Sequence, residues 1–284
     1  MTANSARLMG LADLAPSYDV IFSDVWGVIH NGVGAWPSAA ESLINAREAG
    51  LKVILVSNAP RPHTIVRQQL ERLEMPVAGY DDVVTSGDVT RQLIETRYRD
   101  AKVTHIGPEK DKPLVDGLPV TFTSDEDAEV CLCSGPLDDQ VETPEDYRQR
   151  LQALADRQVP MIVANPDKVV EMGSKLIYCA GALADLYEEM GGETVILGKP
   201  YAPIYQAALD MAGNPPSERV LALGDSERTD LRGAHEQGID CLFLTGGIHA
   251  GEFGPSTMPN PARVAAFLDA SPYNSISWMA RLAW

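Results

Sequence analysis

The sequence predicts an α/β fold, with a parallel sheet covered by helices and a second α/β domain inserted into the first. Short and almost wholly apolar segments, typical of strands buried on both faces, alternate along the chain with segments of helical periodicity. Near residue 87 this alternation stops, and it begins again in the middle of the chain. We therefore expect residues 1–87 and 192–284 to form one sheet domain, and residues 88–191 to form the inserted domain.

In the first segment, apolar runs predict strands, and apolar residues at helical spacing predict helices. Asn31-Gly32 is typical of a tight turn. Gly50 is expected to end the first helix, because glycine readily adopts the backbone conformation that closes a helix. The expected elements are, in order, a strand over 18–24, a helix over 37–49, a strand over 51–56, a helix over 65–73 and a short strand over 83–85.

The same patterns continue through the rest of the chain, with Gly191-Gly192 as a break. Cys131 and Cys133 alternate within one apolar run and should share one face of a strand as buried free thiols, since no second cysteine pair completes a zinc site. Strands are expected over 102–106, 130–133, 161–164, 194–197, 220–223 and 240–244, and helices over 144–157, 174–190, 202–212 and 229–237.

The composition is that of a globular protein, and its charge argues against two classes of partner. Apolar residues make up 45% and charged residues 22% of the 284, and 23 basic against 40 acidic side chains give a net charge of −17. Such a charge disfavours nucleic acid and anionic membrane surfaces. No apolar run reaches the roughly 18 residues of a membrane span, and the N-terminal residues lack the pattern of a secretion signal. We expect a cytoplasmic protein that acts on a small molecule. A homodimer is one of the oligomeric states that the sequence allows.

Polar side chains follow four of the expected strands at the point where each strand ends. These residues are Asp24, Ser57, Lys199 and Asp225. In open parallel sheets, ligands bind just beyond the carboxyl ends of the strands, so these side chains are candidates for one site. A carboxylate can attack phosphorus and form an aspartyl-phosphate intermediate. The four residue types together predict phosphoryl-transfer chemistry.

The charges of this group are complementary once a metal ion is included. Asp24, Asp225 and Asp230 carry −3, while Lys199 and one divalent cation carry +3. The cation should be Mg²⁺, because the ligands on offer are hard oxygens. Ser57 and the backbone N–H groups beside it can hold phosphate oxygens.

Four short motifs are similar to those of the haloacid dehalogenase superfamily. They are Asp24-Val-Trp-Gly-Val28, Val56-Ser-Asn-Ala59, Gly198-Lys-Pro-Tyr201 and Gly224-Asp-Ser-Glu-Arg-Thr-Asp230. The long insert between the second and third motifs, together with Asn165-Pro-Asp167, resembles the subclass with a type IIA cap, whose members are NagD-like and 4-nitrophenylphosphatase-like enzymes. The resemblance implies a Rossmann-like parallel-sheet core with an inserted α/β cap.

The resemblance also implies a role for each matching residue. It implies Asp24 as the nucleophile, Ser57, Asn58 and Lys199 at the phosphate, and Asn165 and Asp167 as cap residues that contribute to substrate choice. Asn-Pro-Asp is equally typical of a tight turn, and this alternative stays open. The Mg²⁺ ligands would be Asp24, Asp225, Asp230 and the backbone carbonyl of Trp26. The implied activity is that of a phosphatase acting on a small phosphorylated metabolite.

One position departs from the phosphatase pattern. Family phosphatases carry a second Asp two residues after the nucleophile, as general acid and base, and this chain has Trp26 there. Two alternatives therefore stay open: a C–P or C–halogen hydrolase on the same nucleophile, and a catalytically weak protein that binds a phosphorylated ligand. His30 is a candidate substitute for the missing acid and base, against the simpler interpretation of a loop histidine at the surface or in contact with substrate.

Overall fold

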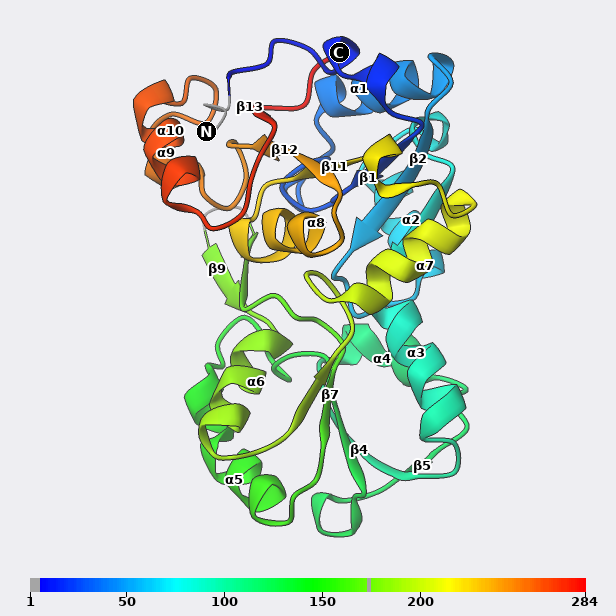
Figure 1. The fold of residues 1–284 in the computed structure, drawn as a ribbon. Helices are drawn as coiled ribbons and strands as arrows, with labels where there is room; N and C mark the ends of the chain where they lie inside the picture. Colours follow the sequence, from blue (N-terminus) through cyan, green and yellow to red (C-terminus); the bar gives the residue numbers. More distant parts are fainter. Residues whose placement is uncertain (1–5, 173–174) are drawn as a thin grey trace. The chain divides into compact units, whose positions relative to one another are not determined.

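The computed structural model describes residues 6–172 and 175–284, and its contacts divide the chain into two compact units. The first unit comprises Met1–Ser57, Arg67–Val84 and Tyr205–Trp284, and the second comprises Asn58–Val66 and Thr85–Ile204. Each unit is built on its own sheet (Figure 1).

Among the residues that the structure describes, none of the helices is both long enough and apolar enough to cross a membrane.

The first unit contains a six-stranded sheet whose order is β13-β12-β11-β1-β2-β3. The chain begins in the centre at β1, builds outward through β2 and β3, and later returns to place β11 on the other side of β1, parallel to it. The neighbours β1 and β11 therefore form the switch point where ligands bind in open sheets of this kind. The strands are β1 (Val20–Ser23), β2 (Lys52–Ser57), β3 (Asp82–Thr85), β11 (Val220–Gly224), β12 (Asp240–Leu244) and β13 (Ser277–Met279).

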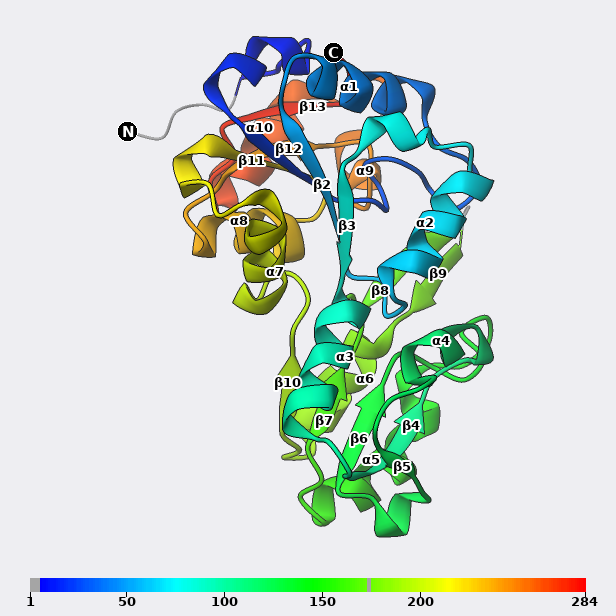
Figure 2. The same ribbon diagram turned by 90° about the vertical axis from the view of Figure 1, so that its right-hand side faces the viewer.

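Helices cover both faces of this sheet, with α1 and α8 on opposite sides (Figure 2). Gly50 follows α1 with a φ of 97°, and its N–H donates to the carbonyl of Arg47, which confirms the predicted end of this helix. The helices of the unit are α1 (Pro37–Glu48), α8 (Arg232–Glu236), α9 (Ala250–Phe253) and α10 (Pro261–Ala270). A π-helical turn, η8 (Glu227–Leu231), directly precedes α8. Two helices, α2 (His63–Arg72) and α7 (Ala202–Ala212), each begin in the second unit and end in the first.

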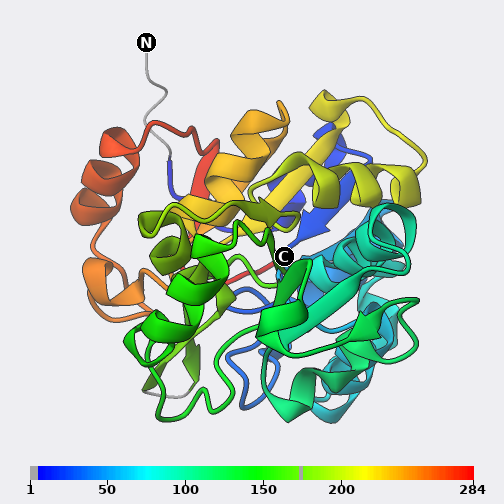
Figure 3. The same ribbon diagram turned by 90° about the horizontal axis from the view of Figure 1, so that it is seen from below.

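The second unit contains a five-stranded parallel sheet of order β10-β7-β6-β4-β5. Helices α3 and α4 lie on one side of it and α5 and α6 on the other (Figures 1 and 3). Its strands are β4 (Lys102–Ile106), β5 (Thr121–Phe122), β6 (Val130–Cys133), β7 (Met161–Val163) and β10 (Thr194–Ile196), with an antiparallel hairpin of β8 (Val169–Met172) and β9 (Lys175–Tyr178). Its helices are α3 (Ser86–Arg97), α4 (Lys112–Val115), α5 (Arg148–Asp156) and α6 (Ala180–Glu189).

Strand β6 shows how the core of the second unit is built. Cys131 and Cys133 pack into the cluster with α5 and α6, while Val130 and Leu132 pack into the cluster with α3 and α4. This alternation is the two-residue period of a strand buried on both faces. It confirms the prediction that both cysteines are buried free thiols on one face. Burial raises the pKa of both thiols, so they stay protonated and unreactive.

Two elements differ from the sequence-based expectation. The expected helix over 174–190 begins at a residue outside the described ranges, and residues 175–178 form β9, so that α6 starts only at Ala180. The sequence predicts β10 in the same sheet as β1, but this strand pairs with β7 of the five-stranded sheet. The first difference reflects a local antiparallel hairpin, in which β9 pairs with β8 a few residues earlier. The second depends on a partner in another part of the chain, about which local periodicity carries no information. Helices α3, α4, α9 and α10 and strands β5, β8 and β13 are additions to the expected elements.

The capping box of α3 gives a test of the fold. The Thr85 hydroxyl accepts the Asp88 N–H at 3.0 Å, and the Asp88 carboxylate accepts the Thr85 N–H at 3.1 Å. Because Thr85 is fully buried, Thr85→Ala should lower the free energy of unfolding by about 1–2 kcal/mol in urea titrations. The exposed Thr64 in α2 is the control, and Thr64→Ala should change stability by less than about 0.5 kcal/mol. Equal losses in the two variants would contradict the capping role.

Candidate active site

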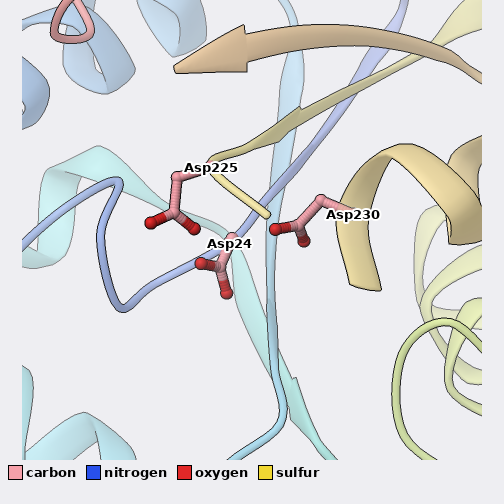
Figure 4. A group of neighbouring side chains, drawn as sticks. All are labelled: Asp24, Asp225 and Asp230. Carbon is pink, nitrogen blue, oxygen red and sulfur yellow. The ribbon is translucent and has the colours of Figure 1, made fainter. Parts of the chain in front are cut away.

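Three aspartates meet at the carboxyl end of the six-stranded sheet. Asp24 follows β1, Asp225 follows β11, and Asp230 lies in η8 just beyond Asp225 (Figure 4). Each offers one carboxylate oxygen, and these three oxygens lie within 4.8 Å of one another. The side chains are at most 8% exposed. The expectation that these three residues come together therefore agrees with their placement at the switch point between β1 and β11.

Backbone hydrogen bonds fix the three residues in place. The Asp24 N–H donates to the Leu223 carbonyl at 2.8 Å and so continues the ladder between β1 and β11. Asp225 accepts the Ile248 N–H at 2.6 Å, and Asp230 accepts the Ser226 N–H at 3.2 Å. These N–H groups hold the Asp225 and Asp230 carboxylates in place beyond the end of β11.

Three glycines allow the backbone to close around Asp225 and Asp230. A Cβ placed on Gly27 or Gly247 would lie 2.0 or 1.8 Å from the Asp225 carboxylate, and one on Gly224 would lie 2.1 Å from Asp230 Cβ. Sequence reasoning missed all three as parts of the site. Gly27 and Gly224 stand inside motifs that are informative for other residues, and nothing local marks Gly247, in the loop after β12, as part of the site.

The three carboxylates are suited to a divalent cation. Like charges this close repel one another, and burial removes the water that would otherwise stabilise them. A cation relieves both costs. Carboxylate oxygens are hard donors, which favour Mg²⁺ or Ca²⁺ over metals that prefer nitrogen or sulfur. The donor set of the site therefore fits the ion that the sequence predicts.

Trp26 and His30 pack against each other in the loop after β1. Their rings are 5.0 Å apart and nearly perpendicular, and the Gly27 N–H donates to the His30 carbonyl at 2.8 Å. The indole also lies over Gly32, where a Cβ would approach it to 2.6 Å. The Trp26 side chain thus contacts its own loop.

His30 is 1% exposed, so it is not the surface histidine that the simpler interpretation expects. Its Nδ1 accepts the Gly32 N–H at 3.0 Å, which leaves the ring proton on Nε2. Burial lowers the pKa of the imidazole from 6.5 to about 4. A neutral, enclosed ring of this kind does not favour a role as the substitute acid and base.

Ser57 and Lys199 are both buried, but they do not follow strands of the same sheet. Ser57 is the last residue of β2, next to β1, and is 7% exposed. Lys199 is 3% exposed and comes after β10, which belongs to the five-stranded sheet. Of the four polar strand ends predicted from the sequence, three therefore belong to one sheet and the fourth to the other.

The Asn58 side chain bonds to the protein itself. Its Oδ1 accepts the Lys199 N–H at 2.7 Å, and its Nδ2 donates to the Lys199 carbonyl at 3.2 Å and to the Asp167 carboxylate at 2.8 Å. Sequence reasoning places Asn58 at the phosphate. With its amide used in this way, the group that Asn58 can offer a phosphate is its backbone N–H.

Asn165 and Asp167 form the turn that Asn-Pro-Asp suggests. The Asn165 side chain accepts the Asp167 N–H at 3.1 Å, which is the hydrogen bond of an Asx turn. Asp167 also carries the contact to Asn58. The turn that Asn-Pro-Asp suggests is therefore present, and the contribution of Asn165 and Asp167 to substrate choice stays a prediction.

Comparisons with known proteins agree with this geometry. A family model described as haloacid dehalogenase-like hydrolase matches residues 21–120, and an HAD-hydrolase-like model matches residues 196–270. The structure is similar to a crystallised hydrolase of the haloacid dehalogenase-like family from Brucella suis 1330, with a TM-score of 0.84 and 43% identity over 96% of this chain and 98% of that one.

Two further relatives carry more specific names. The sequence is 26% identical over 255 residues to the sugar-phosphatase AraL of Bacillus subtilis strain 168, covering 87% of this chain and 90% of that protein. The fold is also similar to that of a glycerol phosphate phosphatase from Mycobacterium tuberculosis, determined in complex with magnesium, with a TM-score of 0.66, 22% identity and coverage of 83% and 70%.

The burial of His30 predicts how stability depends on pH. The folded-state pKa of about 4 lies below the unfolded value of 6.5, so between these values the unfolded chain binds the proton. The free energy of unfolding should therefore fall as pH drops from 6.5 toward 4, with His30 contributing up to about 1.4 kcal/mol per pH unit.

Urea unfolding at pH 7, 6 and 5 measures this effect. His30→Asn keeps an acceptor near the Gly32 N–H but removes the titrating ring, so its pH dependence should be shallower than that of wild type. His235→Asn, at an exposed histidine, should keep the wild-type dependence. Parallel curves for wild type and His30→Asn would show that His30 is not responsible.

Proposed function

This chain belongs to the haloacid dehalogenase-like hydrolase family, and we propose that it is a phosphatase that cleaves phosphate monoesters of small metabolites. The single observation that carries the proposal is the buried cluster of Asp24, Asp225 and Asp230 at the sheet's switch point. Relatives named as a sugar phosphatase and a glycerol phosphate phosphatase support the same reaction class. The substrate is expected to be a small phosphorylated metabolite.

In the proposed reaction, Asp24 attacks phosphorus, the leaving oxygen departs, and water then hydrolyses the aspartyl-phosphate. The backbone hydrogen bond from Asp24 to Leu223 holds the nucleophile at the end of a rigid strand, which favours a fixed line of attack. Lys199, the Ser57 hydroxyl and the backbone N–H groups beside it would bind the oxygens of the phosphoryl group. Their role is to stabilise the charge that these oxygens carry in the transition state.

The residues that would hold Mg²⁺ are Asp24, Asp225, Asp230 and the backbone carbonyl of Trp26. When bound, Mg²⁺ supplies positive charge that offsets the carboxylates and polarises the phosphoryl oxygens. The charges of the site would then cancel, because the three carboxylates carry −3 and one divalent ion together with Lys199 carries +3. Ile248 and Ser226 contribute by holding Asp225 and Asp230 through their N–H groups.

We further propose that the inserted segment, predicted from the sequence as 88–191 between core segments 1–87 and 192–284, is the cap that sets substrate choice. The sheet of this segment also includes β10, so the second core segment begins after that strand. In this proposal Asn165 and Asp167 belong to the specificity-determining part of the cap. Their turn is part of the second unit, where Asp167 contacts Asn58.

Trp26 keeps a second candidate function in view. Because an indole cannot donate or accept the proton that the usual Asp transfers, C–P or C–halogen cleavage on Asp24 and ligand binding without turnover both remain alternatives. One assay separates them. Mg²⁺-dependent release from a chromogenic phosphate ester supports the phosphatase, metal-free activity on 2-haloacids supports a dehalogenase, and phosphate binding without turnover supports a binding protein.

Replacing the nucleophile is the first test of the phosphatase. Asp24→Asn should lower kcat for 4-nitrophenyl phosphate with Mg²⁺ by at least about a thousandfold, because an amide cannot form the covalent intermediate. The exposed Asp269→Asn is the matched control and should keep wild-type activity. Thermal melts of both variants check that each is folded. Retention of more than about a tenth of wild-type kcat in Asp24→Asn would reject Asp24 as the nucleophile.

The consequence of Trp26 is tested with a series of aryl phosphates of graded leaving-group pKa. A positioned general acid contributes about 10²- to 10⁴-fold, so without one the leaving group must depart largely as its anion. A plot of log kcat/KM against leaving-group pKa should be steep for wild type and flatter for Trp26→Asp. His30→Ala should leave the steep slope unchanged. A shallow wild-type slope that His30→Ala steepens would instead identify His30 as the acid.

A further inference from the structure

The Asn58 side chain contacts both backbone polar groups of one residue, Lys199. Its Oδ1 accepts the Lys199 N–H at 2.7 Å, and its Nδ2 donates to the Lys199 carbonyl at 3.2 Å. The amide thus pairs with the lysine's main chain much as a neighbouring strand would. Asn58 is 4% and Lys199 3% exposed, so little water competes for these hydrogen bonds.

Asp167 determines which way round the Asn58 amide lies. A carboxylate only accepts hydrogen bonds, so the amide nitrogen must face Asp167, where Nδ2 donates to Oδ1 at 2.8 Å. This orientation turns the amide oxygen toward the Lys199 N–H. The reversed amide would set its oxygen against the Asp167 carboxylate and the Lys199 carbonyl, and its nitrogen against the Lys199 N–H, which breaks all three hydrogen bonds.

Asp167 is itself fixed by the start of α6 and by its own turn. Its carbonyl accepts the Gly181 N–H at 3.1 Å, and its N–H donates to Asn165 at 3.1 Å. Glycine is required on both sides of the network: a Cβ on Gly181 would lie 2.2 Å from the Pro166 carbonyl oxygen, and one on Gly198 would lie 2.7 Å from Asn58 Oδ1. The chain of contacts from α6 to Lys199 is therefore continuous, and every contact in it lies within the second unit.

We propose that Asn58 is a positioning residue for Lys199 and that Asp167 fixes the orientation in which it acts. A lysine ammonium sits on a flexible four-carbon stem, so where it is presented depends on how firmly its backbone is held. Asn58, whose side chain holds the Lys199 main chain, directly follows Ser57 in the sequence. This inference rests on the proposed function, in which Ser57 and Lys199 bind the same phosphoryl group.

A swap of donor and acceptor tests this network. Asn58→Asp cannot donate to the Lys199 carbonyl and repels Asp167, so kcat/KM for 4-nitrophenyl phosphate should fall about a hundredfold, a loss typical of a displaced catalytic group. Adding Asp167→Asn restores one hydrogen bond, because the new amide can donate to the carboxylate now at position 58, whose other oxygen still accepts the Lys199 N–H. The double variant should therefore recover at least about tenfold over Asn58→Asp. If the fold-losses in kcat/KM of the two single variants simply multiply in the double variant, the proposal is overturned.

A second cycle covers the case in which Asn58→Asp does not fold. Asn58→Ala should also lower kcat/KM markedly, and adding Asp167→Asn to it should cost less than about twofold more, because Asp167 acts on Lys199 through Asn58. If Asp167→Asn costs as much in the Asn58→Ala background as it does alone, Asp167 does not act through Asn58. Asn260→Ala is the matched control, since Asn260 also accepts backbone N–H groups, at the start of α10, and its loss should lower stability without lowering kcat/KM.

The outcomes separate this inference from the proposed function. An active Asp24→Asn variant would reject the proposed phosphatase mechanism itself. An inactive Asp24→Asn variant combined with wild-type kcat/KM in Asn58→Ala would leave the function standing and reject the positioning role of Asn58. If Asn260→Ala lowers the melting temperature as much as Asn58→Ala does and also lowers kcat/KM as much, the role of Asn58 is merely structural.

Discussion

The first unit depends on one constraint, which is the close and buried grouping of three carboxylates. The oxygens of Asp24, Asp225 and Asp230 lie within 4.8 Å of one another, and all three side chains are buried. Such a group is stable only where fixed dipoles and a cation compensate it. Two adjacent parallel strands, β1 and β11, bring the first two aspartates to one edge of the sheet. The close approach of glycine backbones and the N–H groups of Ile248 and Ser226 then hold Asp225 and Asp230.

The lysine that is proposed to balance these charges, Lys199, is held by the other unit. Lys199 follows a strand of the five-stranded sheet, and its backbone is bonded by Asn58, whose amide is in turn held by Asp167. The three carboxylates therefore belong to the first unit, while the hydrogen bonds that hold the main chain of Lys199 belong to the second. A substitution of Asp167 should consequently also disturb the hydrogen bonds that hold the Lys199 main chain.

The loop after β1 explains how an aromatic residue can stand where phosphatases of this family carry an acid. The Trp26 ring rests on Gly32 and against the edge of His30, and the His30 ring is enclosed with its Nδ1 bonded to a backbone N–H. The pair stabilises the loop by packing. This packing does not favour the transfer of a proton to a leaving group.

Much of the fold and part of the site could be predicted from the sequence, because the relevant signals are local. Apolar runs predicted the buried strands, Gly50 predicted a helix end, and strand ends predicted Asp24, Ser57 and Asp225. The tertiary structure decided what depends on the pairing partner, whether that partner is a neighbour in the chain, as for β9, or lies farther away, as for β10. It paired 175–178 with 169–172 instead of extending a helix, and it placed β10 in the second sheet. It buried His30, and it turned the Asn58 amide toward Lys199. Periodicity reports which face of an element is apolar, but only packing determines which other element covers that face.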